Sequence, residues 1–175
     1  AQDAIAFPVT EGKSYDVGGF KKYHQGQNEI VDVQYFEELS ENLTYTVTDV
    51  NNKDVTSRDE MDMYHGSYIS CEAIVNSLPT NYTKAFSVNT KINGKDIDLR
   101  VDPKNMPTED FDDIVTTIKG TVVGSKLTVK GIMSAFGYGK PSNQIAIVKA
   151  KDIKAAALTD ADIVSAVKGA LTIDA

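Results

Sequence analysis

Residues 84–101 decide the predicted fold, and they read KAFSVNTKINGKDIDLRV. Apolar and polar side chains alternate on both sides of Asn93-Gly94, a dipeptide that favours a tight two-residue turn. The apolar positions of the two halves are Phe86, Val88 and Ile92, and then Ile97, Leu99 and Val101. A period of two is typical of half-buried strands, so this stretch predicts a β-hairpin with one face towards a core.

Further strands are expected on both sides of this hairpin. Residues 67–78 (SYISCEAIVNSL) are rich in β-branched residues and predict a long strand, followed by a loop at Pro79-Thr80-Asn81. On the C-terminal side, residues 126–135 and 144–153 predict two more strands. A glycine- and proline-containing loop at residues 136–142 separates them.

The period of the apolar residues changes after Asp102-Pro103, which ends the third strand. Thr108 is the expected N-cap of a helix, and the acidic residues that follow it suit the positive end of the helix dipole. The apolar stripe of this helix, which we expect to face the core, consists of Phe111, Ile114, Val115 and Ile118. Residues 63–154 therefore predict three strands, a helix and two strands.

This order resembles the OB-fold, a five-stranded, partly open barrel, and here the helix falls between the third and fourth strands. Residues 124–131 (GSKLTVKG) resemble the fourth strand of secreted bacterial OB-like domains, and residues 143–153 (NQIAIVKAKDI) resemble the fifth. The resemblance covers about half of the chain. It implies a mainly β fold: an OB-like Greek-key barrel with an N-terminal β extension and a C-terminal helix.

Residues 1–62 are expected to form the N-terminal β-rich extension. Residues 12–20 echo residues 124–132, and residues 28–33 echo residues 143–148. The extension is therefore either a degenerate half of a second OB-like unit or a set of unrelated hairpins. Glu41–Val50 predicts one more strand, and the polar residues 51–60 predict a linker.

Residues 155–175 predict a C-terminal helix or a linker to a following domain, with an apolar stripe at helical spacing. This segment resembles the opening of the atrophied immunoglobulin-like domains of large bacterial surface proteins. The resemblance implies that the chain is part of a longer, secreted or cell-surface multidomain protein, with neighbouring domains among its partners.

Composition and charge narrow the classes of partner. The 175 residues are 41% hydrophobic and 25% charged, which is ordinary for a soluble globular protein. The net charge of −7 divides into −8 for residues 1–62, +3 for residues 63–154 and −2 for the rest, so only the central segment tolerates a polyanion. No run of 18 apolar residues occurs, and we expect no membrane insertion.

No pattern for catalysis, a metal ion or a cofactor is found in the sequence. Cys71 is the only cysteine, and its apolar surroundings predict a buried thiol. The acids between Glu109 and Asp113 favour a solvated helix start over a metal site, and residues 49–54 lack the glycine of a calcium loop. The two isolated histidines, His24 and His65, are expected at the surface. We therefore expect a protein that is not an enzyme.

The OB resemblance implies a ligand groove across the second and third strands, flanked by the loops at residues 79–84 and 136–142. The candidate groove residues are Tyr82, Lys84, Phe86, Arg100, Phe136, Tyr138 and Lys140. Aromatic rings beside cations suit stacking on nucleic-acid bases or sugar rings. In the alternative interpretation, Phe136 belongs to the core and the two tyrosines are ordinary surface residues.

The function that these features favour is a non-catalytic extracellular binding module for a single-stranded oligonucleotide or a glycan. The alternative is a structural or assembly module of a bacterial surface protein or fibre, which binds another protein and no small ligand.

Overall fold

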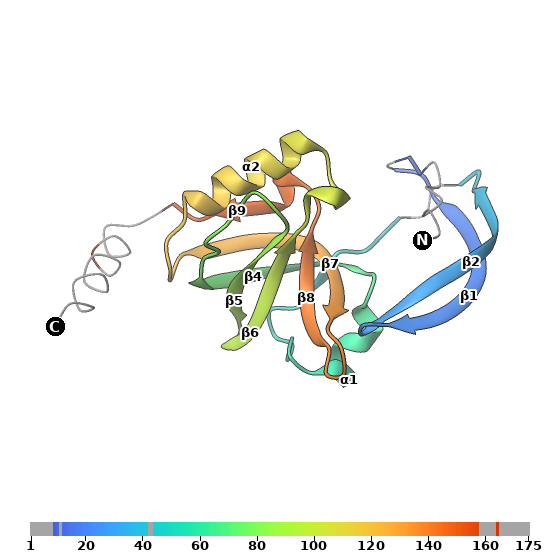
Figure 1. Cartoon of the computed structure of the whole chain (residues 1–175), viewed down its shortest axis with the longest axis horizontal. Coiled ribbons are helices and arrows are strands. Elements are labelled where there is room, and N and C mark those ends of the chain that lie inside the picture. Colours follow the sequence, from blue (N-terminus) through green and yellow to red (C-terminus); the bar gives the residue numbers. More distant parts are fainter. Residues whose placement is uncertain (1–8, 11, 42–43, 158–163, 165–175) are drawn as a thin grey trace. The chain divides into compact units, whose positions relative to one another are not determined.

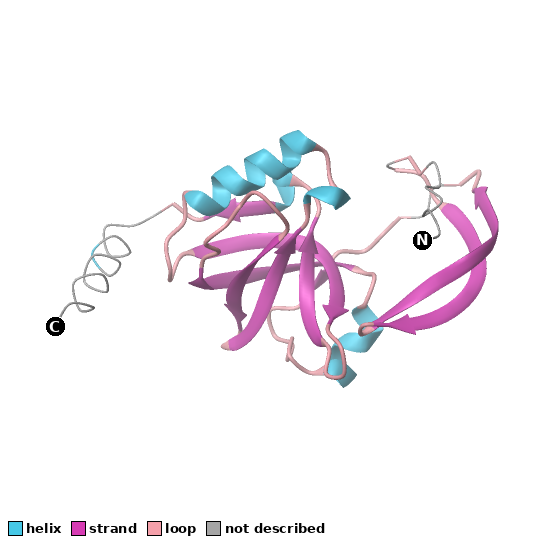
Figure 2. Ribbon diagram, in the orientation of Figure 1, coloured by secondary structure: helices cyan, strands magenta, loops and turns pink. Residues whose placement is uncertain are grey.

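The computed structural model describes residues 9–10, 12–41, 44–157 and 164. The protein is mainly β, with few helices (Figure 2). Its elements in chain order are β1 (Tyr15–His24), β2 (Gln27–Glu38), β3 (Thr48–Asp49), α1 (Arg58–Met61), η1 (Asp62–Tyr64), β4 (Tyr68–Ser77), β5 (Phe86–Ile92), β6 (Lys95–Val101), η2 (Pro103–Asn105), α2 (Thr108–Lys119), β7 (Lys126–Phe136), β8 (Ser142–Ile147), η3 (Ala150–Asp152) and β9 (Ile153–Ala155).

The chain divides into two compact units. The smaller unit contains β1 and most of β2, which pair as a two-stranded sheet. Gln25 and Gly26 join these strands with φ values of 49° and 95°, as a tight two-residue hairpin turn requires. The larger unit starts at Val47 and also includes this turn, Gln25–Gln27.

The larger unit is a closed, five-stranded mixed barrel (Figure 1). Its strands are hydrogen-bonded in the order β4-β5-β6-β8-β7, and β4 pairs with β7 to close the ring. Strands β6 and β8 run parallel, with Leu99 opposite Ile145, and the other neighbours in the ring run antiparallel. The short strand β3 lies parallel to β4, and β9 lies antiparallel to β7. This arrangement is compatible with an OB-like fold.

The alternation in residues 84–101 forms the predicted hairpin. Phe86 pairs with Val101 and Ile92 with Lys95, so β5 and β6 are in register along their whole length. The apolar positions point into the barrel and are buried. Thr90 is buried among them, and its hydroxyl donates to the carbonyl oxygen of Ile97 at 2.9 Å. The turn at Asn93-Gly94 has φ values of 49° and 74°, which confirms its predicted geometry.

Helix α2 lies across one end of the barrel (Figure 1). Phe111, Ile114 and Ile118 are buried in the same core as the strands, and Val115 is partly buried against it. The predicted N-cap is wrong by one residue: Thr108 is the first residue of the helix, and Pro107 precedes it without a side-chain cap. Asp110 instead accepts a hydrogen bond from the backbone N–H of Ala150 at 2.7 Å, which ties the helix to the chain after β8.

Two predicted strands differ from the structure. The strand predicted over residues 144–153 is divided, because the chain turns through η3 and re-enters the sheet as β9 beside β7. Asp152 in that turn is buried and accepts a hydrogen bond from the hydroxyl of Tyr68, so the turn is held from inside the fold. The strand predicted over Glu41–Val50 is reduced, within the described residues, to β3 at Thr48–Asp49.

Residues 47–62 belong to the larger unit, whereas the sequence prediction places them in the N-terminal extension. Val50, Val55 and Met61 are fully buried in the barrel core, and the first three residues of α1 lie in the segment predicted as a linker. The C-terminal helix predicted for residues 155–175 lies outside the described residues, apart from residues 155–157 and 164.

Gly131 occupies a close approach between β7 and β8 inside the barrel. A Cβ atom at this position would lie 2.7 Å from the carbonyl oxygen of Ala146 and 2.7 Å from Cγ2 of Ile145. A glycine in the interior of a strand is typical of such backbone approaches. The close approach of β7 to β8 in the closed ring therefore depends on glycine, which has no side chain, at this position.

We expect Gly131→Ala to lower the free energy of unfolding by about 1–3 kcal/mol, because the added methyl group forces the two strands apart. Chemical denaturation of the two proteins measures the difference. Gly120→Ala is the matched control, since a Cβ there meets its nearest atoms at an ordinary 3.5 Å. A loss at Gly131 no larger than that at Gly120 would refute the close-approach argument.

We expect Ile114→Ala to lower the free energy of unfolding by about 2–5 kcal/mol, because it leaves a cavity where a fully buried side chain packs in the barrel core. Val115→Ala removes a branched side chain from the next position on the same helix, which is only partly buried, and should cost less. Equal losses in denaturant melts would show that α2 is not packed as described.

Candidate functional site

A groove with a volume of about 590 Å³ crosses the outer face of β5, β6, β8 and β7. The strand registers arrange its floor in two cross-strand rows. One row contains Arg100, Ala146 and Ile132, and the other contains Asp98, Gln144 and Ser134. The outward residues of the parallel pair β6–β8 therefore form the centre of the groove.

The hollow results from side-chain size. Ala146 lies in the middle of one row and Ser134 at the β7 end of the other, and both fill little space above the sheet. Larger side chains, Arg100 and Phe136, stand at the sides of the groove. Phe136 is 54% exposed, which excludes the interpretation that it is a core residue. A small floor with one exposed ring beside it can accommodate a flat, elongated ligand.

The charged side chains that line the groove are Asp98, Arg100 and Asp102. The guanidinium of Arg100 lies 3.8 Å from a carboxylate oxygen of Asp102. The other carboxylate oxygen of Asp102 accepts the backbone N–H of Lys104 at 3.1 Å, so this acid is held in place. The groove thus has two acids for one base and a local negative balance.

A chain of amides leads from β4 to the acid in the floor of the groove. Asn76 donates to the side-chain oxygen of Asn89 at 2.7 Å, and Asn89 donates to Asp98 at 3.1 Å. One carboxylate oxygen of Asp98 is therefore already bonded, which fixes the orientation of the group. Gln144, beside Asp98 on the neighbouring strand, adds a second side chain that can both donate and accept.

Of the seven predicted groove residues, Arg100 and Phe136 line this groove. Tyr138 and Lys140 are exposed in the loop between β7 and β8 and are not part of its lining. Lys84 is exposed in the loop before β5.

Phe86 requires a correction, because it is only 5% exposed and belongs to the core. It lies in phase with the inward-facing Val88, and its ring packs at 6.1 Å from that of Phe111 on α2. Tyr82 packs edge-on against Phe86 at 5.2 Å, and Nζ of Lys119 lies 5.2 Å from the Tyr82 ring. Tyr82 and Phe86 therefore connect α2 to the barrel, and Phe86 cannot contact a ligand in the groove.

The polar residues of the floor were not predicted. Asp98 alternates with Ile97 and Leu99, so the pattern that identified the core face of β6 also identified an outward polar face. Gln144 and Ser134 come from distant parts of the chain. Only the pairing of β8 between β6 and β7 brings them beside Asp98, and no local pattern specifies that pairing.

A second polar cluster holds the segment around α1 against β8. Asn143 is buried, and its amide donates to the carbonyl oxygens of Val55 at 2.8 Å and Ser57 at 3.1 Å. Its oxygen accepts from Arg58 at 3.0 Å and lies 3.2 Å from Nε2 of His65. The contacts of this cluster are those of a structural clasp, because each polar atom of Asn143 is used within it.

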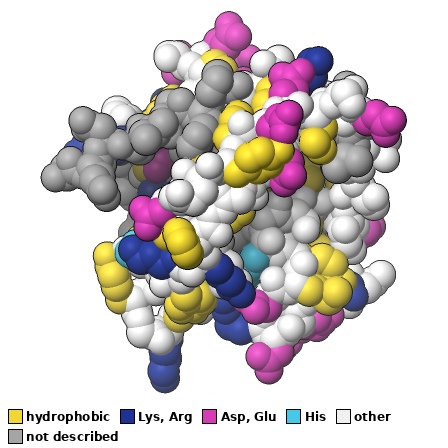
Figure 3. Space-filling model, turned by 90° about the vertical axis from the view of Figure 1, so that its right-hand side faces the viewer, with side chains coloured by type: hydrophobic (Ala, Val, Ile, Leu, Met, Phe, Trp, Pro, Cys, Tyr) yellow, Lys and Arg dark blue, Asp and Glu magenta, His cyan; other side chains and the backbone are white. Residues whose placement is uncertain are grey.

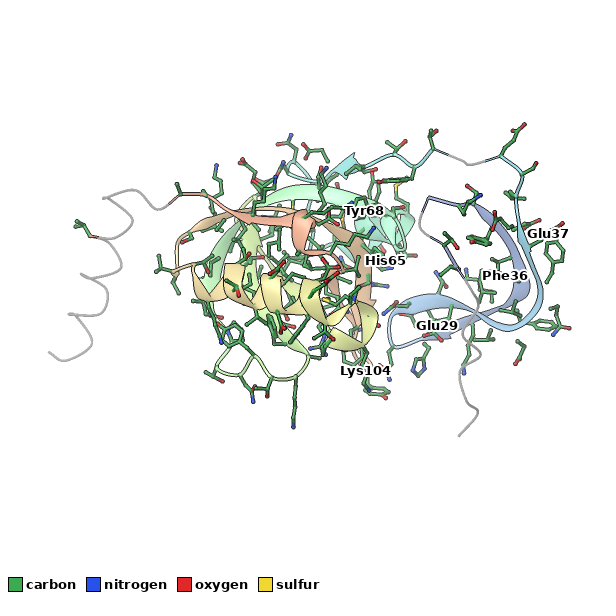
Figure 4. The ribbon with its side chains drawn as sticks, turned by 90° about the horizontal axis from the view of Figure 1, so that it is seen from above. Glu29, Phe36, Glu37, His65, Tyr68 and Lys104 are labelled. Carbon is green, nitrogen blue, oxygen red and sulfur yellow. The ribbon has the colours of Figure 1, made fainter. Side chains whose placement is uncertain are left out.

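The expectation that His65 lies at the surface is wrong, since its side chain is only 7% exposed within this clasp (Figure 4). Nδ1 of His65 makes no hydrogen bond and lies 3.4 Å from a carboxylate oxygen of Asp62. Within the described ranges, no three His, Cys, Asp or Glu side chains gather closely enough to hold a metal ion.

Cys71 is 2% exposed on the inward face of β4, which confirms the prediction of a buried thiol. Burial, with a smaller contribution from the carboxylate of Asp49, raises the pKa of this thiol to about 12. The folded protein therefore keeps the sulfur protonated near neutral pH, where a nucleophile would need to be a thiolate.

We expect the Cys71 thiol to resist alkylation in the native protein at pH 8 and to react readily in denaturant, because only the unfolded chain exposes it and ionises it near pH 9. Between pH 9 and 12 the unfolded chain releases a proton that the folded protein retains, so stability should fall as the pH rises. Cys71→Ala should show a weaker pH dependence in that range. Native and denatured rates of alkylation that are the same would contradict this assignment.

The described helices include none that is both long and apolar enough to cross a membrane. No protein-family model matches the chain, and no curated protein is significantly similar to it in sequence.

Proposed function

We propose that residues 47–157 form an OB-like, non-catalytic binding module and that its ligand is an uncharged glycan chain held in the outer groove. The order of the barrel strands and the parallel pair β6–β8 support the OB-like assignment. So does the position of α2, which follows the third barrel strand and precedes the fourth. OB-folds bind oligosaccharides and oligonucleotides on the outer face of the barrel.

The charge of the groove is the observation that favours a glycan over a nucleic acid. Proteins that bind nucleic acids gain much of their affinity from several lysines and arginines that neutralise phosphates. Here Asp98 and Asp102 outnumber Arg100, and Arg100 already lies beside Asp102. A phosphate in the groove would be repelled, whereas a sugar hydroxyl can donate to a carboxylate and accept from the guanidinium.

Five of the lining residues have a role in this proposal. Asp98, fixed by Asn89, accepts a hydrogen bond from one sugar hydroxyl, and Gln144 beside it contacts the next. Arg100 and Asp102 recognise a further hydroxyl as a donor and acceptor pair. The exposed ring of Phe136 packs on the apolar face of a sugar ring, as aromatic side chains commonly do in ligand pockets.

The same contacts support recognition without catalysis. Hydrolysis of a glycosidic bond requires a carboxylic acid that donates a proton and a second carboxylate that acts as base or nucleophile. One carboxylate oxygen of each groove acid is engaged by the protein, Asp98 by Asn89 and Asp102 by the backbone N–H of Lys104, and the proposal assigns both acids to recognition. The resemblance of residues 124–131 and 143–153 to secreted bacterial OB-like domains supports an extracellular or cell-surface site of action.

A binding screen with neutral glycans and oligonucleotides at low salt tests the proposal. We expect a glycan to bind and Asp98→Ala or Phe136→Ala to weaken it about tenfold, since each removes a hydrogen bond or a packed ring from the ligand. Tyr138→Ala is the control, because it removes an exposed aromatic ring from the neighbouring loop outside the groove lining. Denaturation midpoints of all variants should stay close to that of the parent.

Two results would overturn the proposal. Binding of oligonucleotides that weakens steeply with salt would identify a polyanion ligand. Glycan binding that survives both groove substitutions would place the ligand elsewhere on the chain.

A further inference from the structure

The smaller unit includes the hairpin of β1 and β2, and its described residues form no core of their own. None of its described residues, 9–10, 12–24, 28–41 and 44–46, is buried. Phe20 is 63% exposed and Tyr23 is 60% exposed, and Ile30 and Tyr35 are also exposed. A two-stranded hairpin alone is only marginally stable in water. On ten- and twelve-residue strands, such exposed apolar side chains mark a surface that a partner can cover.

Both edges of this hairpin are available for pairing. The sheet to which β1 and β2 belong has, in the described part of the chain, no third strand. Each outer edge presents a row of backbone N–H and C=O groups, which is a template for another strand. The barrel strands close on themselves, whereas each hairpin strand has only one neighbouring strand among the residues that the structure describes.

The two edges carry opposite charge. Strand β1 contains Lys21 and Lys22 with one acid, Asp16, and no ion pair involves either lysine among the described residues. Strand β2 contains no base, and its acids are Glu29, Asp32, Glu37 and Glu38. Figure 4 labels Glu29 and Glu37 on β2. The β1 edge is basic in its second half, and the β2 edge is acidic along its length.

We propose that the hairpin is a self-assembly element in which the β1 edge of one copy pairs with the β2 edge of the next. Charge selects this pairing over the two symmetric ones. A β1–β1 contact brings the lysines of two copies together, and a β2–β2 contact brings together two acidic strands. Like charges in opposed positions of neighbouring strands are destabilising, and opposite charges are stabilising.

The geometry of an antiparallel ribbon permits this pairing to repeat. When β2 of a second copy adds beside β1, the strands continue to alternate in direction without reversing the copy. Each addition covers exposed side chains such as Phe20 and Tyr23 with those of a neighbouring strand. The contact is head-to-tail, so it generates an open filament or a closed ring and never stops at a symmetric dimer. On the face drawn in Figure 3, hydrophobic side chains are exposed at separate places between acidic and basic side chains.

Sedimentation of the full chain at rising concentration and at two salt concentrations tests the proposal. The parent protein should form species larger than a dimer at low salt, and high salt should reduce them because exposed charges are screened. Lys21→Glu/Lys22→Glu makes both edges acidic, and Glu29→Lys/Glu37→Lys/Glu38→Lys leaves Asp32 as the only acid of β2 and makes the β2 edge basic. Each variant alone should shift the association midpoint about tenfold or more, because attractive pairs become repulsive.

Mixing the two variants is the decisive step. The acidic β1 edge of the first fits the basic β2 edge of the second, and the unchanged edges fit one another, so the mixture should associate as the parent does. Lys130→Glu/Lys140→Glu is the control for the first variant, with the same change in net charge on two exposed lysines of the larger unit, and it should assemble like the parent. Circular dichroism of each variant checks that the barrel is intact.

A parent chain that stays monomeric, or that stops at a dimer, would overturn the proposal. So would variants that assemble like the parent, or a mixture that fails to restore association. These outcomes are independent of the groove, because glycan binding by the larger unit is measured on the same variants and should not change.

Discussion

The pairing of β4 with β7 is the contact on which the larger unit depends. It joins the two ends of a five-stranded sheet, so that every inward side chain belongs to one core and every outward side chain to one continuous surface. Because the ring is closed, the barrel has no free strand edge that could pair with a strand of another molecule. Closure requires the bare backbone of Gly131 where β7 passes β8, and it places α2 over one end of the core.

The position of β8 between β6 and β7 creates the groove. Strand β8 pairs in parallel with β6 and antiparallel with β7, which brings Asp98, Gln144 and Ser134 into one row. Ser134 follows Asp98 by 36 positions in the chain and Gln144 follows it by 46, and neither would lie beside Asp98 in a hairpin or a meander. The hydrogen bonds that orient Asp98 come from the opposite side, through Asn89 and Asn76 on β5 and β4. The recognition surface is therefore a product of the topology.

The sequence predicts well those features that depend on neighbouring residues. Alternation identified the β5–β6 hairpin, and helical spacing identified Phe111, Ile114 and Ile118 as core. The prediction from sequence failed where residues distant in the chain determine the structure. The last predicted strand is divided at a turn whose Asp152 accepts a hydrogen bond from Tyr68. Val55 is buried, although the residues around it predict a linker. Phe86 was misassigned because an aromatic residue at the edge of a loop can serve a core or a ligand, and its phase on the strand decides between them.

Charge shows most clearly why a segment's composition does not describe its surfaces. Residues 63–154 have a net charge of +3, which suggests a barrel that tolerates polyanions. The lysines, however, lie around loops and other faces: Lys126 pairs with Glu72, Lys91 with Asp96, and Lys119 lies by Tyr82. The groove itself has Asp98 and Asp102 with one arginine. A ligand experiences the charges within about a Debye length, so the local balance of the groove governs its choice of ligand more than the sum over the segment does.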